Sequence, residues 1–215
     1  MLNDVIFNNE KSAYYDWNIV LTKASIPLPS VKTSIVDIKG ADGTLDLSEV
    51  LTGDVCYSNR DIKLDFAILD DKCYYSTISE IANYIHGKKL TIKLTNDAEY
   101  FYSGRASISQ LEYSPGKSTV CVQISADPYK YRVDETSVTV AVSDETKHVN
   151  LYNKRMRVSP TLIVTGSVSM TFEGKTYTLQ EGEQQLLNFL LSEGNNAVTF
   201  SGKGSVTITY RQGEL

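Results

Sequence analysis

Hydrophobic and polar side chains alternate along most of the chain, which is typical of β-strands that bury one face. Residues 62–68 and 90–94 show this alternation without a break. The longer stretch 100–113 changes phase before Leu111, as a β-bulge requires. The Ser-Pro-Gly-Lys sequence at 114–117 favours a turn, and the alternation resumes after it. We therefore expect a β-hairpin in this part of the chain.

One segment instead has the spacing of a helix. Its apolar residues recur at i, i+4, i+7, i+8 and i+11 and so form one stripe: Tyr74, Ile78, Ile81, Ala82 and Ile85. Asp70 or Asp71 can cap the first N–H groups, and Gly87 can adopt the left-handed conformation that ends a helix. The pattern predicts a helix over about 72–86, packed across a sheet built from the neighbouring strands.

A charged stretch that contains proline, residues 127–137, interrupts the alternation. Short strand patterns follow it at roughly ten-residue spacing, which indicates an antiparallel β-sandwich. We interpret Gly202-Lys203-Gly204 as a hairpin turn, whereas the apolar run 186–191 fits either a helical turn or a buried strand. The predicted fold class is mainly β, with two β-sandwich domains, of which the first carries the packed helix.

The predicted division of the chain follows from these patterns. The first domain covers residues 1–132, a linker covers 133–137, and the second domain covers 138–215. A chain of 215 residues and 23.9 kDa is long enough for two such domains, each with its own core.

Composition narrows the classes of function. The chain has 21 basic and 26 acidic residues, and this net charge of −5 argues against dedicated nucleic-acid binding. No apolar run is long enough to cross a membrane, and the first residues lack the features of a signal peptide. Cys56, Cys73 and Cys121 form no C-x-x-C pair, so we expect reduced thiols in a protein assembled in a cytosol. Fourteen tyrosines suit half-buried sheets and protein interfaces.

Candidate catalytic chemistry is sparse, and we expect no enzyme, no metal and no cofactor. The two histidines, His86 and His148, have no neighbours at the spacing of metal ligands or catalytic pairs. Asp42, Asp46 and Glu49 lack the spacing of an EF-hand, so Asp side chains bonded to the local backbone are favoured over calcium ligands. A glycan hydrolase whose two carboxylates lie far apart in the chain stays open as a weaker alternative.

A carbohydrate-binding protein is the stronger alternative, because β-sandwiches are common lectin scaffolds. A sugar ring usually rests on an exposed aromatic face, yet the single tryptophan, Trp17, lies outside the second domain. Tyr152, Tyr177 and Tyr210 are the candidate platforms for a sugar or a partner. Tyr177 and Tyr210 also fit the inward phase of their strands, so both interpretations of these two residues stay open.

Several blocks of the first half stand in a distinctive order and spacing: IKGADGTLDLSEVLTG (38–53), Asn59-Arg60, YIHGKKLTI (84–92), EYFYSGRASI (99–108) and ISADPYKYR (124–132). Together they resemble the N-terminal domain of siphophage distal tail proteins, the Dit family. The C-terminal stretch EGNNAVTFSGKGSVTITYRQGEL resembles the galectin-like domain of the same family. The resemblance covers nearly the whole chain and indicates a short form without added sugar-binding modules.

This resemblance implies a structural role at the tip of a long non-contractile phage tail. A homohexameric ring, single or paired back to back, would join the tail tube protein to the tail-tip hub or tail-associated lysin protein. A receptor-binding protein is a further partner by the same resemblance, and DNA would be only passing cargo. The source would be a free phage or a prophage, with assembly in the host cytoplasm and no sugar site kept in the galectin-like domain.

The candidate ring contact lies in residues 40–60, which contain several glycines and no sustained alternation. We expect an excursion that reaches the next subunit. Its predicted apolar anchors are Leu45, Leu47 and Leu51, and its predicted polar rim is Asp42, Asp46, Glu49 and Arg60. The alternative, in which these leucines fold back on their own domain, stays open because apolar loop residues often pack on the nearest core.

Overall fold

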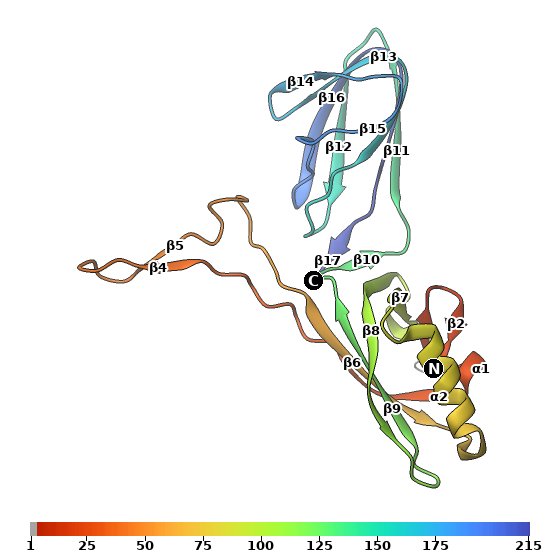
Figure 1. The fold of residues 1–215 in the computed structure, drawn as a ribbon. Coiled ribbons are helices and arrows are strands. Elements are labelled where there is room, and N and C mark those ends of the chain that lie inside the picture. Colours follow the sequence, from red (N-terminus) through yellow and green to blue (C-terminus); the bar gives the residue numbers. More distant parts are fainter. Residues whose placement is uncertain (1–3) are drawn as a thin grey trace. The chain divides into compact units, whose positions relative to one another are not determined.

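The computed structural model describes residues 4–215, which form two compact units with separate hydrophobic cores (Figure 1). The first unit ends at Lys130, and the second covers Tyr131–Glu214. The fold is mainly β, with antiparallel strand pairing and one long helix, which confirms the predicted fold class. Strand β11 begins at Thr136, so the stretch expected as a linker belongs to the second unit.

The first unit is built around one curved sheet and a helix. Its sheet has the strand order β2-β1-β7-β8-β9-β6-β3, while β4 and β5 pair only with each other. The elements are β1 (Val5–Phe7), β2 (Lys11–Ser12), α1 (Ala13–Trp17), β3 (Ile19–Ser25), β4 (Ile35–Asp37), β5 (Thr44–Asp46), β6 (Arg60–Ile68), α2 (Tyr74–Ile85), β7 (Lys89–Leu94), β8 (Tyr100–Glu112) and β9 (Thr119–Ala126). Short 3₁₀ turns lie at Asp71–Cys73 and Thr95–Asp97.

Strands β8 and β9 form the hairpin that the alternation predicted. The register between them shifts between Ile108 and Gln110, where the sequence changes phase. At the tip, the Lys117 N–H donates to the Ser114 carbonyl at 2.7 Å, and Gly116 has a φ of 75°. This geometry matches a turn with proline before a left-handed glycine, so the bulge and the turn are both confirmed.

Helix α2 covers the inner face of the sheet with the predicted stripe. Tyr74, Ile81 and Ile85 are buried, and Ile78 packs at the edge of the same core. The Asp70 carboxylate accepts the Lys72 N–H at 3.0 Å, so the helix begins with a 3₁₀ turn before its α-helical part. Gly87 follows the helix with a φ of 79°.

The second unit consists mostly of long strands. Its elements are β10 (Lys130–Arg132), β11 (Thr136–Ser143), β12 (Lys147–Asn153), β13 (Thr161–Phe172), β14 (Lys175–Thr178), β15 (Gly182–Gln185), β16 (Gly194–Tyr210) and β17 (Gly213–Glu214). Strand β13 pairs with β16 along the whole length of β13, from Thr161 to Phe172. One half of this pair is flanked by β12 and β14, and the other half by β11 and β15. The two halves enclose one core between them.

The interpretation of Gly202-Lys203-Gly204 as a hairpin turn is wrong, because β16 continues through it. Gly202 pairs with Val168, and Gly204 pairs with Gly166, in the middle of the long pair. Gly166, Gly202 and Gly204 all have positive φ, and their missing side chains let the two backbones come close together. Glycine serves a turn and a bend inside a strand equally well, so the local sequence could not distinguish them.

Replacing Gly202 by Ala is expected to destabilise the second unit by about 2–4 kcal/mol. An added Cβ would lie 2.3 Å from the Ser167 carbonyl oxygen, at a φ of 113° that side chains rarely adopt. Thermal unfolding followed by circular dichroism measures the loss. Gly174→Ala is the matched control, because Gly174 also has positive φ but has open space around its Cβ position. Equal losses in the two variants would contradict the close approach at Gly202.

The apolar run 186–191 forms a single turn and not a buried strand. The Phe189 N–H donates to the Leu186 carbonyl at 3.1 Å and so closes a turn. Phe189 and Leu191 are buried, whereas Leu187 is 94% exposed.

Candidate interaction surface

Residues 27–59 leave the sheet between β3 and β6 and form a projecting segment, which we call the arm (Figure 1). At its base the Lys32 N–H donates to the Cys56 carbonyl and the Ser58 N–H to the Ser30 carbonyl, both at 2.8 Å. Farther out, β4 and β5 form a hairpin in which Val36 faces Leu45. The excursion predicted for residues 40–60 is therefore the second half of a longer segment. The first half begins with two prolines and has no sustained alternation, and the sequence did not predict it.

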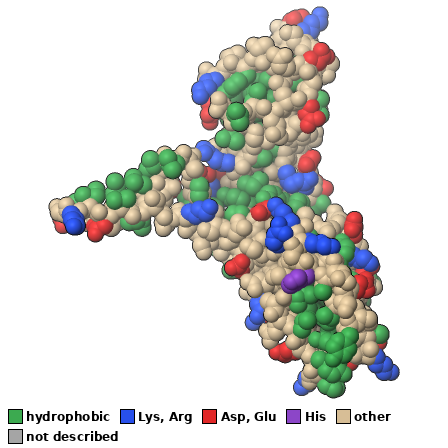
Figure 2. Space-filling model, viewed as in Figure 1, with side chains coloured by type: hydrophobic (Ala, Val, Ile, Leu, Met, Phe, Trp, Pro, Cys, Tyr) green, Lys and Arg blue, Asp and Glu red, His purple; other side chains and the backbone are tan. Residues whose placement is uncertain are grey.

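The arm carries large apolar side chains in contact with solvent. Its exposed large hydrophobic residues are Leu28, Val31, Ile35, Val36, Ile38, Leu45, Val50 and Leu51. Figure 2 shows hydrophobic side chains gathered along this segment. Leu51 is 96% exposed and Leu45 48% exposed, so neither folds back on its own domain. Leu47 is half-buried, and its N–H donates to the Ser34 carbonyl at 2.8 Å.

The carboxylates of the arm bond locally or face solvent. The Asp46 carboxylate accepts the Ser48 N–H at 2.9 Å and the Ser48 hydroxyl at 2.5 Å. These bonds, first of all that of the hydroxyl, hold the pKa of Asp46 below its ordinary value. Asp42 and Glu49 are exposed. Within residues 4–215 no group of three His, Cys, Asp or Glu side chains could hold a metal ion.

Arg60 does not lie with these carboxylates. It begins β6, is 3% exposed, and donates to the Pro128 carbonyl, with its guanidinium 5.5 Å from the centre of the Tyr102 ring. Burial lowers the pKa of Arg60. Its side chain is therefore used inside the first unit and is not available for the polar rim that the sequence suggested.

Of the three candidate tyrosines, Tyr152 alone presents much of its ring to solvent. It is 51% exposed, whereas Tyr210 is 5% exposed and donates its hydroxyl to the Tyr152 carbonyl at 2.6 Å. Burial raises the pKa of Tyr210. Tyr177 packs at the edge of the core. Tyr177 and Tyr210 thus follow the inward phase of their strands.

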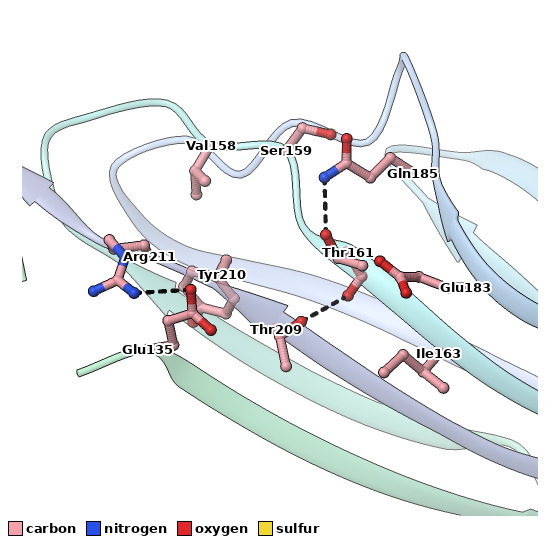
Figure 3. A pocket seen from close by; sticks show the side chains of 10 residues that line it. All are labelled: Glu135, Val158, Ser159, Thr161, Ile163, Glu183, Gln185, Thr209, Tyr210 and Arg211. Atoms are coloured by element: carbon pink, nitrogen blue, oxygen red, sulfur yellow. Dashed lines mark hydrogen bonds and ion pairs between the residues drawn. The ribbon is translucent and has the colours of Figure 1, made fainter. Parts of the chain in front are cut away.

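The second unit also has a pocket that the sequence did not reveal (Figure 3). Its volume is about 370 Å³, and polar side chains from several strands line it. These side chains lie up to 76 residues apart in the chain, and none belongs to a recognisable motif. Only the pairing of the strands brings them together.

Comparison with solved structures finds proteins with the same fold. One of them is the SPP1 Dit (gp 19.1) protein, described as a paradigm of the hub adsorption apparatus in phages that infect Gram-positive bacteria. The match covers 100% of both chains with a TM-score of 0.73 and 15% sequence identity, so the two proteins share a fold. No family model matches the sequence, and no curated protein matches it.

The structure also bears on membrane association. Among the helices in residues 4–215, none is both long enough and apolar enough to cross a bilayer.

Proposed function

We propose that this protein is a structural subunit of the tip of a long non-contractile phage tail. Six copies would form a ring, alone or back to back with a second ring. The ring would join the tail tube protein to the tail-tip hub or tail-associated lysin protein, and a receptor-binding protein would attach to it. The full-length likeness to SPP1 Dit, a hub protein rather than an enzyme, supports this role.

The arm is the structural feature that best supports the proposal of a ring. An isolated two-stranded hairpin is marginally stable in water, and this one exposes a row of large apolar side chains. Contiguous apolar surface of this kind usually marks a protein interface. The arm therefore gains most stability when another protein covers it, and a neighbouring copy is the partner that a ring requires.

A cyclic ring also needs a second, different surface on each subunit to receive the first. The first unit has another exposed apolar patch, made by Tyr75 and Tyr113. The Tyr75 and Tyr113 rings stack with their centres 6.0 Å apart, and Tyr113 also contacts the buried Tyr74. This patch is a suitable surface for a second copy or for the tail tube protein.

Solution mass tests the proposal directly. Light scattering coupled to gel filtration is expected to give six or twelve times the chain mass of 23.9 kDa. Negative-stain images of the same fraction should show rings with an open centre. A monomer over the whole accessible concentration range, and also in the presence of the tail tube protein, would contradict the ring.

A further inference from the structure

We propose that the pocket of the second unit is a binding site for a neutral saccharide. The side chains that would contact it are Ser159, Thr161, Glu183, Gln185, Thr209 and Arg211. All lie in the second unit, whereas the arm belongs to the first.

The pocket lies on the outer face of one half of the sandwich. Strand register places Thr209 opposite Thr161, and Thr161 opposite Gln185, in one row across three strands. In the next row, Ile163 lies opposite Glu183. Figure 3 shows these side chains surrounding one hollow. Its volume, about 370 Å³, is at the lower end of the range of roughly 300–1,000 Å³ for ligand sites, which leaves room for one or two sugar rings.

The lining offers both donors and acceptors to a ligand with many hydroxyl groups. The Gln185 amide donates to the Thr161 hydroxyl at 2.8 Å, which leaves the Thr161 proton for another acceptor. Among residues 4–215, the Glu183 carboxylate makes no hydrogen bond or ion pair, and it can accept two hydroxyl protons. Ile163, which is 46% exposed, provides an aliphatic surface for the C–H face of a sugar ring.

Charge and polarity exclude other classes of ligand. Arg211 pairs with Glu135 at 2.9 Å, so the charge of Glu183 is left without compensation and would repel phosphate or carboxylate groups. A predominantly apolar ligand would bury hydroxyl, amide and carboxylate groups without partners. A simple cation would bind Glu183 alone and leave the hydroxyl groups and the amide unused. A neutral polyol satisfies the whole lining.

Arg211 is held in place before any ligand arrives. Its guanidinium donates to the carbonyls of Arg132 and Val133 as well as to Glu135. A side chain fixed in this way loses little conformational freedom on binding. The pocket differs from an exposed aromatic platform, because planar polar groups and an aliphatic wall replace the ring. A sugar site here therefore departs from the expectation that the second domain keeps none.

Ligand-observed NMR on the full chain tests the site. Saturation transfer would be measured with glucose, galactose, rhamnose, N-acetylglucosamine and their disaccharides, at up to about 50 mM because single-site sugar affinities are often millimolar. At least one of these sugars is expected to bind. Glu183→Gln is expected to weaken that binding about tenfold or more, since a hydrogen bond to a charged group has at least this effect. Gln185→Ala removes a neutral hydrogen bond and is expected to weaken it about two- to tenfold.

Two control variants make the result specific. Glu181→Gln makes the same chemical change two residues away, outside the pocket, and Tyr152→Ala removes the exposed aromatic ring. Both are expected to bind the sugar as the parent protein does. No binding by any sugar of the panel would overturn the proposal. The proposal would also be overturned if Tyr152→Ala abolished sugar binding while Glu183→Gln left it intact. The solution mass tests the ring separately.

Discussion

Ile81→Asp is expected to unfold the first unit. Ile81 is fully buried in the middle of α2, within the core that the helix shares with the sheet. A carboxylate there would have no partner, and the variant would also lose the buried aliphatic side chain. Together these effects cost more than about 5 kcal/mol, which is comparable to the whole stability of a domain.

Trp17 reports on this change. It is the single tryptophan of the chain, is 3% exposed, and donates its indole N–H to Glu80 of α2 at 3.2 Å. Its fluorescence should shift to the red in Ile81→Asp. Ser79→Asp places the same side chain on the exposed face of the same helix and should leave the spectrum unchanged. A soluble Ile81→Asp protein with native Trp17 fluorescence would show that α2 does not pack as described.

The elements that the sequence predicted well are those whose burial is periodic. In β6 every second residue from Ile62 to Ile68 is buried, and in α2 the stripe that includes Ile81 and Ile85 faces the core. Such patterns arise because one face of each element is removed from water, so they can be recognised without knowledge of the neighbouring elements.

Features that depend on distant partners were not predictable. Arg60 follows an exposed loop, and only the fold brings it to Pro128 and Tyr102. The first strand of the arm has no buried face and therefore no alternation. The pocket of the second unit is lined by side chains from separate strands. Its lining residues can therefore be identified only when the register of those strands is known.

The double variant Leu45→Ser, Leu51→Ser is expected to convert rings into monomers. Both side chains are exposed on the arm, so their replacement should leave the core and the fold intact. If a neighbouring copy covers them, each contributes about 1.5–3 kcal/mol to the contact. Losing both weakens every contact of the ring by more than about a hundredfold. Leu47 is left unchanged because it is half-buried within the arm.

Light scattering and circular dichroism together decide the outcome. The mass should fall to 23.9 kDa while the spectrum and the Trp17 fluorescence stay native. Leu187→Ser is the matched control, since Leu187 is 94% exposed but lies in the second unit, and this variant should still form rings. Rings that survive the double change in the arm would show that another surface, such as the patch around Tyr75 and Tyr113, holds the subunits together. An equal loss of rings in Leu187→Ser would place the contact in the second unit.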